Sequence, residues 1–503
     1  MTQNNKIYAP NVYLFAYDFC NSSESEVPLW QKCHEILQTK LAISSAFKDS
    51  YLPKAKEPRG GRVRLINPEV VDKRNSLAFA KEISHDNQQI SLKGFAEPLR
   101  INDAYALGLQ IRIPEKVNGV KTPSVGVSIF KEFNPDNCLL PDFVQSYFGQ
   151  TLLITAWLSV EQNQAAREDS QFLKNLAQQC LENFIVGDNL PSFYRQGELF
   201  GSPILEYGDP SRPDTGCHVI VWFFNNSATD NIWDETRYSD FVDLFLYRNK
   251  ILHAYKDTRK IYFKTRQEYE QIEADIEKTF KYLQREKAHQ RQSKGAGLKP
   301  EELEYLESQI IEMPPRAVEY TRLLIDMENR QNTIAINAKN YQNKLNLISL
   351  DIKSQKVYND SDADLSFLEL FSKETCPQFQ EQIKFDLGYF RHGTGLLDKA
   401  MEAIKGVVAI EEARRDAELQ ATIQVVGSAL GFVGIVASVA PYLIKQDPPD
   451  RKFYLPLSNI EIPSFILVLL ISLGAGFGVW MSVWAIAQLK KILPKIKQRL
   501  PFR

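Results

Sequence analysis

Two long uncharged runs near the C-terminal end constrain the fold of this chain more than any other feature. The first covers residues 419–444 and the second covers residues 462–489, and neither contains Asp, Glu, Lys or Arg. Each run exceeds the ~20 residues that a helix needs to cross a ~30 Å hydrocarbon core. The sequence therefore predicts a hairpin of two transmembrane helices at the end of a large soluble body, with the lipid bilayer as a partner.

The length, charge and cysteine content limit the number of domains, the kinds of partner and the cellular compartment that can be expected. A chain of 503 residues predicts two or more domains. The net charge of −2 gives no general footprint for nucleic acid, so no nucleic-acid partner is expected. The six cysteines are scattered, without a CxxC pair or a zinc spacing, which favours isolated core thiols in a reducing compartment. The first residues do not form a signal peptide, so we expect the N-terminal part to be cytoplasmic.

Residues 1–235 have the pattern of an α+β domain. Runs rich in β-branched and aromatic residues predict strands, and two stretches with helical spacing predict helices packed on the sheet. The predicted strands are 12–17, 107–113, 125–130, 151–159, 204–207 and 218–224, and the predicted helices are 30–41 and 171–185. We interpret this domain as sensor-like, with a small-molecule ligand as its candidate partner. The basic stretch 54–64 is either a contact for an anionic ligand or, as its Pro and Gly content favours, an ordinary surface loop.

Residues 236–394 predict a set of helices. One apolar seam steps by 4 and 3 without a miss, through Tyr320, Leu324, Met327, Gln331, Ile334, Ala338, Tyr341, Leu345 and Ile348. Such a seam is typical of a coiled coil or of one member of an intramolecular bundle, and the flanking helices favour the bundle. Pro314 and Pro315 predict the end of the preceding helix. The stretch 392–395 predicts a further break, with Thr394 as the N-cap of the next helix.

The predicted last helix runs over residues 395–444 and is about 75 Å long, so that a cytoplasmic stalk continues into the first crossing at about 420–444. One face of this crossing carries small and polar residues, namely Gln424, Ser428, Gly431, Ile435 and Ser438. Small residues permit close helix packing. They also suit a helix that lines a narrow pore. Both interpretations stay open, and the second gives these five residues as candidate pore-lining residues.

The predicted outer loop is residues 445–461, and its acids Asp447, Asp450 and Glu461 either form cation-attracting rings in an oligomer or belong to an ordinary solvated loop. In the second crossing, residues 462–489, Gly474 and Gly478 have the GxxxG spacing of helix packing. The tail, residues 490–503, carries six Lys or Arg residues against three in the loop. The positive-inside rule therefore places both termini in the cytoplasm of an inner- or plasma-membrane protein.

This layout resembles the CorA-type magnesium transporters. The resemblance lies in the order of the parts: an N-terminal cytoplasmic domain, long helices, a long helix that continues into the first of two C-terminal crossings, and a basic tail. It implies a homopentamer whose first crossing lines an ion pore, with a divalent cation as the transported ion. The family's Gly-Met-Asn motif is absent, because the corresponding position reads Ala440-Pro441-Tyr442. Magnesium selectivity therefore does not carry over, no cofactor is identified, and the metal is unknown.

Three functions follow from these observations. The first is a CorA-like oligomeric channel or transporter, most simply for cations, that is gated by its cytoplasmic domain. The second is a membrane effector of signalling or antiviral defence that is switched by a ligand or a nucleotide messenger. The third is a non-conducting membrane scaffold. An enzyme is the least favoured class, because the sequence contains no GxSxG, P-loop, HExxH or Rossmann glycine motif.

Overall fold

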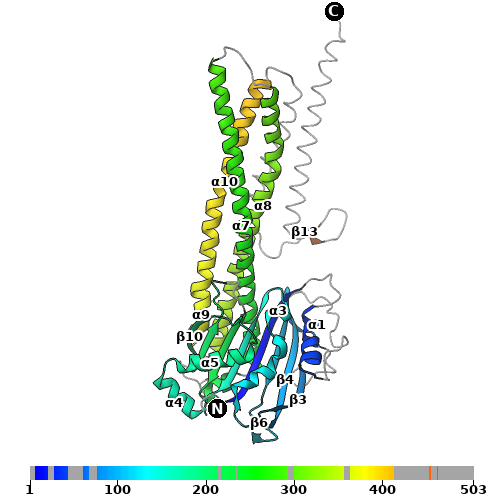
Figure 1. Cartoon of the computed structure of the whole chain (residues 1–503), viewed down its shortest axis with the longest axis vertical. Coiled ribbons are helices and arrows are strands. Elements are labelled where there is room, and N and C mark those ends of the chain that lie inside the picture. The colour runs from blue at the N-terminus through cyan, green and yellow to red at the C-terminus, as the bar shows by residue number, and fades with distance from the viewer. Residues whose placement is uncertain are drawn as a thin grey trace, which may run out of the picture. The chain divides into compact units, whose positions relative to one another are not determined.

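The computed structural model shows the arrangement of the helices and strands (Figure 1). It describes residues 6–20, 28–43, 61–66, 76–212, 217–233, 235–292, 300–355, 363–412, 453–454 and 461–462. The chain divides into two units. The first contains Met1–Lys260 and Glu328–Lys384, and the second contains Ile261–Met327 and Phe385–Arg503.

One mixed β-sheet organises the first unit. Its described strands run in the order β10-β11-β12-β9-β1-β5-β4-β2, with β3 paired to β4 and β8 paired to β1. All neighbours are antiparallel except β12 and β9, which are parallel. The strands are β1 (Lys6–Phe19), β2 (Arg62–Arg64), β3 (Leu77–His85), β4 (Gln88–Ile101), β5 (Ala104–Arg112), β8 (Val125–Gly126), β9 (Gly149–Trp157), β10 (Phe193–Leu199), β11 (Ser202–Tyr207) and β12 (His218–Phe224). The short strands β6 (Lys116–Val117) and β7 (Val120–Lys121) pair separately.

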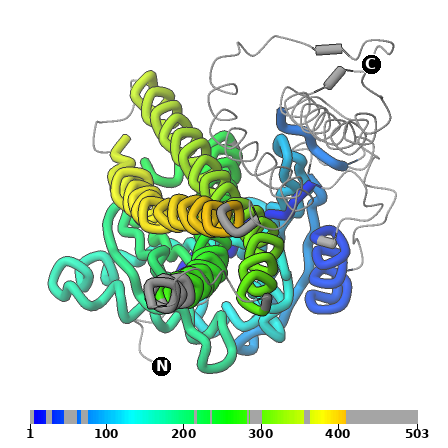
Figure 2. The backbone as a smooth tube through the Cα atoms, turned by 90° about the horizontal axis from the view of Figure 1, so that it is seen from above, coloured from blue at the N-terminus to red at the C-terminus, as the bar shows by residue number. Residues whose placement is uncertain are grey.

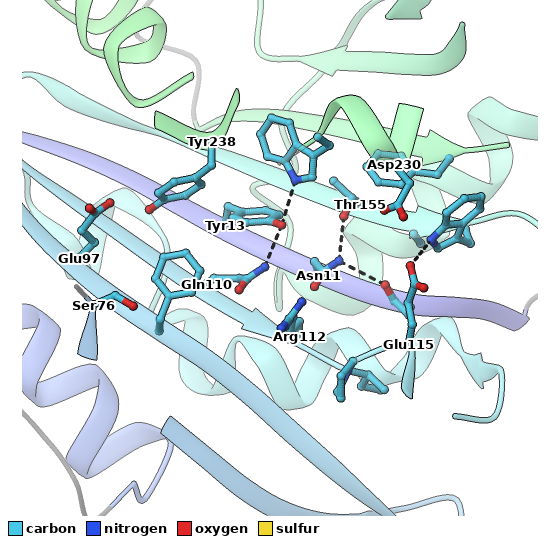
Figure 3. Close-up of a pocket in the computed structure, with 18 of the residues that line it drawn as sticks. Asn11, Tyr13, Ser76, Glu97, Gln110, Arg112, Glu115, Thr155, Asp230 and Tyr238 are labelled. Atoms are coloured by element: carbon cyan, nitrogen blue, oxygen red, sulfur yellow. Dashed lines mark hydrogen bonds between the residues drawn. The ribbon is translucent and has the colours of Figure 1, made fainter. Parts of the chain in front are cut away.

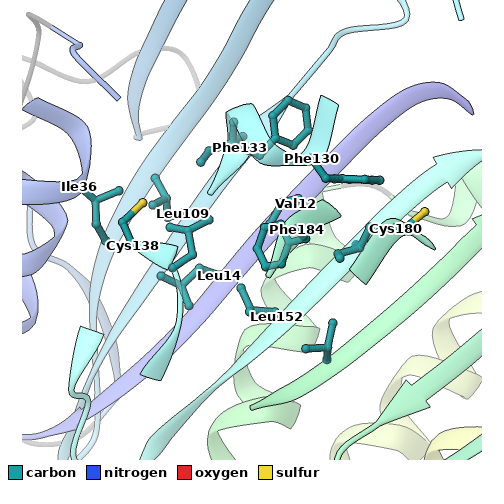
Figure 4. Close-up of a cluster of buried hydrophobic side chains, with 14 of the residues drawn as sticks. Val12, Leu14, Ile36, Leu109, Phe130, Phe133, Cys138, Leu152, Cys180 and Phe184 are labelled. Carbon is teal, nitrogen blue, oxygen red and sulfur yellow. The ribbon is translucent and has the colours of Figure 1, made fainter. Parts of the chain in front are cut away.

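The central strand β1 is buried on both faces. Its even-numbered residues Val12, Leu14 and Ala16 belong to a large apolar core with Leu109 of β5 and Leu152 of β9 (Figure 4). Short helices cover this core and contribute Ile36, Phe130, Phe133 and Phe184. They are α1 (Pro28–Glu35), η2 (Ile36–Lys40), η4 (Val127–Ile129), α2 (Phe130–Phe133), η5 (Pro135–Asn137), α3 (Pro141–Val144), α4 (Val160–Glu168) and α5 (Phe172–Phe184).

The opposite face of the sheet is aromatic. Successive side chains of a strand point to opposite faces, so Tyr13, Phe15 and Tyr17 of β1 share this side. Here they meet α6 (Ser227–Ile232) and the first turns of α7 (Glu235–Gln292). Phe15 lies 5.6 Å from Tyr238 and 5.2 Å from Phe245 between ring centroids. The hydroxyl of Tyr17 donates a 2.7 Å hydrogen bond to the carbonyl of Val242, which ties β1 to α7.

Helices make up the described part of the second unit apart from one short pair of strands, and the units divide within three helical runs. The long helices are α7 and α8 (Pro300–Ser354), and α9 (Ser366–Leu370) continues through η6 (Phe371–Thr375) into α10 (Cys376–Glu412). In the second unit, the end of α10 lies beside the start of α8 (Figures 1 and 2). The two helices share an apolar cluster that includes Leu306, Ile310, Ile404 and Val408. The hydroxyl of Tyr320 donates a 2.7 Å hydrogen bond to the carbonyl of Phe390. The seam predicted on α8 is largely buried, as expected for a helix packed against its neighbours.

Two predicted helix breaks are wrong. α8 continues through Pro314 and Pro315, and α10 continues through Gly393. A Cβ on Gly393 would lie 2.8 Å from the ring of Tyr269 and from the hydroxyl of Tyr320, so this glycine permits a close approach of helices instead of ending one. Thr394 donates to the carbonyl of Arg391 within the helix and does not cap it.

The expectation of two transmembrane helices is corrected by the structure. Among the described residues, no helix is both long enough and apolar enough to cross a membrane. The physical reason is that α7, α8 and α10 bury an apolar stripe and expose charged residues elsewhere. The predicted fold class with two membrane helices, and the integral-membrane localisation with it, are therefore wrong for the part of the chain that the structure describes, which is an α+β domain with long helices. The runs 419–444 and 462–489 lie outside the described residues.

We predict that the apolar face of the central strands dominates the stability of the first unit. Leu152 is fully buried in the middle of β9, so Leu152→Ala leaves a cavity and should lower the free energy of unfolding by about 2–5 kcal/mol. Val186 is 63% exposed, and Val186→Ala should change it by less than about 0.5 kcal/mol. Urea denaturation followed by tryptophan fluorescence measures both. Equal effects of the two substitutions would contradict the assignment of the core.

Candidate functional site

A cavity of about 560 Å³ lies in the first unit, on the aromatic face of the sheet (Figure 3). Strands β1, β4, β5 and β9 form its floor, and α6 with the start of α7 forms its roof. The strand register explains why its polar residues meet. Asn11 of β1 is paired with Arg112 of β5 and with Thr155 of β9, and Tyr13 is paired with Gln110. Directly paired residues on adjacent strands share one face, so these five side chains converge.

The phenol of Tyr13 organises the floor of the cavity. Its hydroxyl oxygen accepts hydrogen bonds from Nε2 of Gln110 at 2.8 Å and from Nε1 of Trp233 at 3.0 Å. Asn11 donates from Nδ2 to Oγ1 of Thr155 at 3.2 Å. Burial raises the pKa of Tyr13, more than the hydrogen bond from Trp233 lowers it, so the phenol stays neutral at pH 7. The floor is thus a fixed, neutral hydrogen-bonding surface.

Two acceptor atoms on this floor lack a partner. Within the described residues, Oε1 of Gln110 and Oδ1 of Asn11 are buried and make no hydrogen bond. Gln110 is only 4% exposed. A buried acceptor without a partner costs about 1–3 kcal/mol, and a bound group that donates a hydrogen bond would recover that cost. This pair of atoms marks the cavity as a candidate binding site.

Tyr238 closes one side of the cavity. Its hydroxyl lies so close to β5 that a Cβ on Gly108 would be 1.8 Å away, so only glycine fits there. Burial, and then the charge of Glu97, raises the pKa of Tyr238 well above its ordinary value. Glu97 itself accepts a 2.8 Å hydrogen bond from Nε of Arg64. This side of the cavity therefore presents a neutral phenol and a neutralised ion pair.

The other end of the cavity holds two acidic side chains, Glu115 and Asp230. Glu115 accepts a 2.8 Å hydrogen bond from Nε1 of Trp157. Burial, and then the charge of Glu115, raises the pKa of Asp230. Arg112 also lines the cavity, and among the described residues its guanidinium makes no hydrogen bond or ion pair that would neutralise it. This end therefore carries two acids, Asp230 and Glu115, with Arg112 and Lys116 also lining the cavity and no ion pair between these acids and bases within the described residues.

A second buried polar cluster lies on the same face of the sheet, around Glu206 of β11. Its Oε1 lies 2.9 Å from Nε2 of His218 and 3.0 Å from Nη2 of Arg248, and its Oε2 accepts from Nε of Arg195 at 2.6 Å. Burial alone would raise the pKa of Glu206, but the hydrogen bond from His218 and the charge of Arg248 hold it below its ordinary range. Burial, with the charge of Arg248, lowers the pKa of His218 to about 4.

This second cluster has the character of a structural tie. The guanidinium of Arg195 lies 4.3 Å from the ring centroid of Phe367, and that of Arg248 lies 5.1 Å from that of Phe371. The hydroxyl of Tyr341 donates to the carbonyl of Leu368 at 3.1 Å. Each cation bonds to Glu206, although Nη1 of Arg248 has no partner within the described residues. The cluster joins the sheet to α7 and α9.

Most site residues predicted from the sequence cannot be placed. Nine of them lie outside the described residues: Gln424, Ser428, Gly431, Ile435, Ser438, Asp447, Asp450, Gly474 and Gly478. The tenth, Glu461, lies in β14 (Glu461–Ile462), where it pairs with Tyr454 of β13 (Phe453–Tyr454). The pore-lining and acidic-ring assignments stay predictions. In the described part of the chain, no group of three or more His, Cys, Asp or Glu residues is placed to hold a metal ion.

Sequence reasoning missed the residues of the cavity. Gln110 and Thr155 stand inside the predicted strands 107–113 and 151–159, and Asn11 stands directly before the predicted strand 12–17, within the observed β1. The available signal was a polar residue inside each apolar run, which costs free energy unless a partner is present. The pairing that brings these residues together depends on strand order, which the sequence pattern did not supply.

The chain has no match among known protein families, and no curated protein matches its sequence. The resemblance to CorA-type transporters therefore stays a prediction from the order of the parts.

We predict that His218 makes the first unit sensitive to mild acid. The folded pKa of about 4 lies below the ordinary 6.5, so protons favour the unfolded chain, and the stability is complete above pH 6.5 and is lost as the pH falls toward 4. The unfolding free energy should fall by about 2 kcal/mol between pH 7 and pH 5 from this group. His218→Gln keeps a donor to Glu206 and should flatten this dependence in urea denaturation. The exposed His392→Gln should leave it unchanged, and an equally steep slope in His218→Gln would refute the assignment.

Proposed function

We propose that the first unit is a small-molecule-binding sensor domain, and that the chain is a ligand-responsive regulatory protein. The observation that carries this proposal is the buried, unpaired Oε1 of Gln110 on the floor of the cavity, next to the unpaired Oδ1 of Asn11. A volume of about 560 Å³ lies within the range of small-molecule sites, which are mostly apolar cavities with a few convergent polar groups.

The walls of the cavity favour a ligand with a flat apolar part. Tyr13 lies edge-on to Trp233 at 5.7 Å and tilted against Tyr238 at 6.0 Å between ring centroids. Trp157 and Phe224 form a second edge-to-face pair at 5.7 Å near the acidic end. Aromatic side chains bury a large apolar area of a ligand and lose little conformational entropy. The amide groups between them fix the orientation of the ligand.

The position of Tyr238 and Trp233 supports a sensor over a passive carrier. Both line the cavity, and Tyr238 belongs to the first turn of α7. The preceding residue, Arg237, is 4% exposed and bonds to Asp240 at 3.0 Å and to Asp351 near the end of α8. A ligand that shifts Tyr238 therefore acts on the residue next to an ion pair that joins the buried Arg237 of α7 to the half-exposed Asp351 of α8. Such a contact couples ligand binding to helix packing within the first unit.

The ion-channel function predicted from the sequence needs residues 413–489, of which only β13 and β14 are described. It stays a prediction. Catalysis is not part of the proposed function, because the proposal uses the cavity residues only to bind and orient a ligand.

The proposal is tested by screening a library of cellular metabolites against the full chain by thermal shift, followed by calorimetry of the hits. We expect at least one metabolite to raise the melting temperature. Gln110→Met removes the acceptor and should weaken its binding about tenfold, since a lost hydrogen bond in a buried site costs about 1–3 kcal/mol.

Gln150 provides a matched control for this substitution. It is also 4% exposed, and its Oε1 is likewise unpaired among the described residues, but it does not line the cavity. Gln150→Met should bind the same metabolite with unchanged affinity. Unchanged binding by Gln110→Met, or equal losses in the two variants, would show that the cavity is not the binding site.

A further inference from the structure

We infer that the ligand is a small zwitterion whose cationic group binds between Asp230 and Glu115, and whose acidic group binds to Arg112. This inference rests on the proposed function, because it names the ligand class of the same cavity. It rests mainly on the charged residues Arg112, Glu115 and Asp230, whereas the proposed function rests on Gln110 and Asn11. The inference can therefore fail while the cavity stays a binding site.

The first step is the acidic end. Asp230 of α6 and Glu115, which follows β5, lie at one end of the cavity (Figure 3). Burial, and then the negative charge of Glu115, raises the pKa of Asp230, so the charged form of Asp230 is disfavoured at this end of the cavity. The single hydrogen bond from Trp157 to Glu115 does not supply a positive charge. A cation placed between the carboxylates would relieve this repulsion.

The second step is the kind of cation. The indole of Trp157 is a hydrogen-bond donor and cannot serve as a metal ligand. The ring of Phe224 packs edge to face against that of Trp157 at 5.7 Å between centroids, and both rings line the cavity. Aromatic faces beside carboxylates attract ammonium and other organic cations, through the ring quadrupole and the carboxylate charge together. The surroundings therefore favour an organic cation over a metal ion.

The third step is the opposite charge. Six side chains that are charged in their ordinary state at pH 7 line the cavity, three acids and three bases: Arg64, Glu97, Arg112, Glu115, Lys116 and Asp230. Arg64 and Glu97 bond to each other at 2.8 Å. Arg112 lies on β5 directly opposite Asn11 and has no ion pair within the described residues. A guanidinium in this position suits a carboxylate or another planar acid.

The fourth step is the acceptor beside Arg112. Oε1 of Gln110, on a side chain only 4% exposed, has no donor within the described residues and lies on the same strand as Arg112, two residues away. Gln110 lies on the side of Arg112 away from Glu115 (Figure 3). An N–H or O–H group that the ligand carries next to its acidic group would satisfy this acceptor.

The test compares matched probes on two aromatic skeletons. The zwitterions are L-tryptophan and L-tyrosine, the amines are tryptamine and tyramine, and the acids are indole-3-propionate and 3-(4-hydroxyphenyl)propionate. Calorimetry with the full chain should show that the zwitterion of a set binds at least about tenfold more tightly than its amine or its acid. Asp230→Asn should weaken the zwitterion and amine about tenfold but spare the acid, and Arg112→Gln should do the reverse.

The exposed Asp188→Asn serves as the control and should bind every probe as the natural chain does. Melting curves without probe establish that each variant is folded. Acids that bind as tightly as zwitterions, unchanged binding by Asp230→Asn, or no binding of any probe at millimolar concentration would overturn the inference. If Gln110→Met weakens a metabolite found in the screen while Asp230→Asn does not, the ligand class is wrong and the proposed function stands. If neither variant affects any binding, both fail.

Discussion

The alternation of side chains along the central strand β1 determines how the first unit is built. Val12, Leu14 and Ala16 point to one face and enter the large apolar core, while Asn11, Tyr13 and Phe15 point to the other. A shift of register by one residue would exchange these two sets. The burial of both faces fixes the register, and the register in turn fixes which residues of β5 and β9 stand beside Asn11 and Tyr13. The cavity is therefore a consequence of the same constraint that forms the core.

Much of the first unit could be predicted from apolar runs, because a buried strand has a strong local pattern. β1, β5, β9, β11, β12 and α5 lie close to their predicted positions. β3 and β10 were missed because they alternate buried or half-buried residues with exposed ones, such as Glu82 and Glu198, and form no continuous apolar run. The predicted strand 125–130 fails because only Val125–Gly126 pairs with β1 before the chain turns helical.

In the helices, strong local signals led to wrong predictions. Gly393 and the pair Pro314–Pro315 are strong local signals for a break, and the structure overrides both. At Gly393 the close contact with Tyr269 and Tyr320 leaves no room for a side chain. The glycine that weakens the helix locally therefore permits its packing. Such a contact joins residues far apart in the chain and has no local signature. The same holds for the cavity, whose floor depends on four strands that meet only through the order of the sheet.

The two buried polar clusters on the aromatic face show how a structural site differs from a binding site. Around Glu206, each of Arg195, His218 and Arg248 bonds to the one carboxylate, so the cluster holds the sheet and helices together without help from outside. In the cavity, Asp230 faces another acid, and the acceptor of Gln110 is unpaired among the described residues. Removing one partner from a cluster in which every charged group bonds to another destabilises a protein, whereas a cavity with unpaired groups is stabilised by a ligand that bonds to them. The lack of partners in the cavity, more than the presence of polar residues, is what favours a ligand at this position.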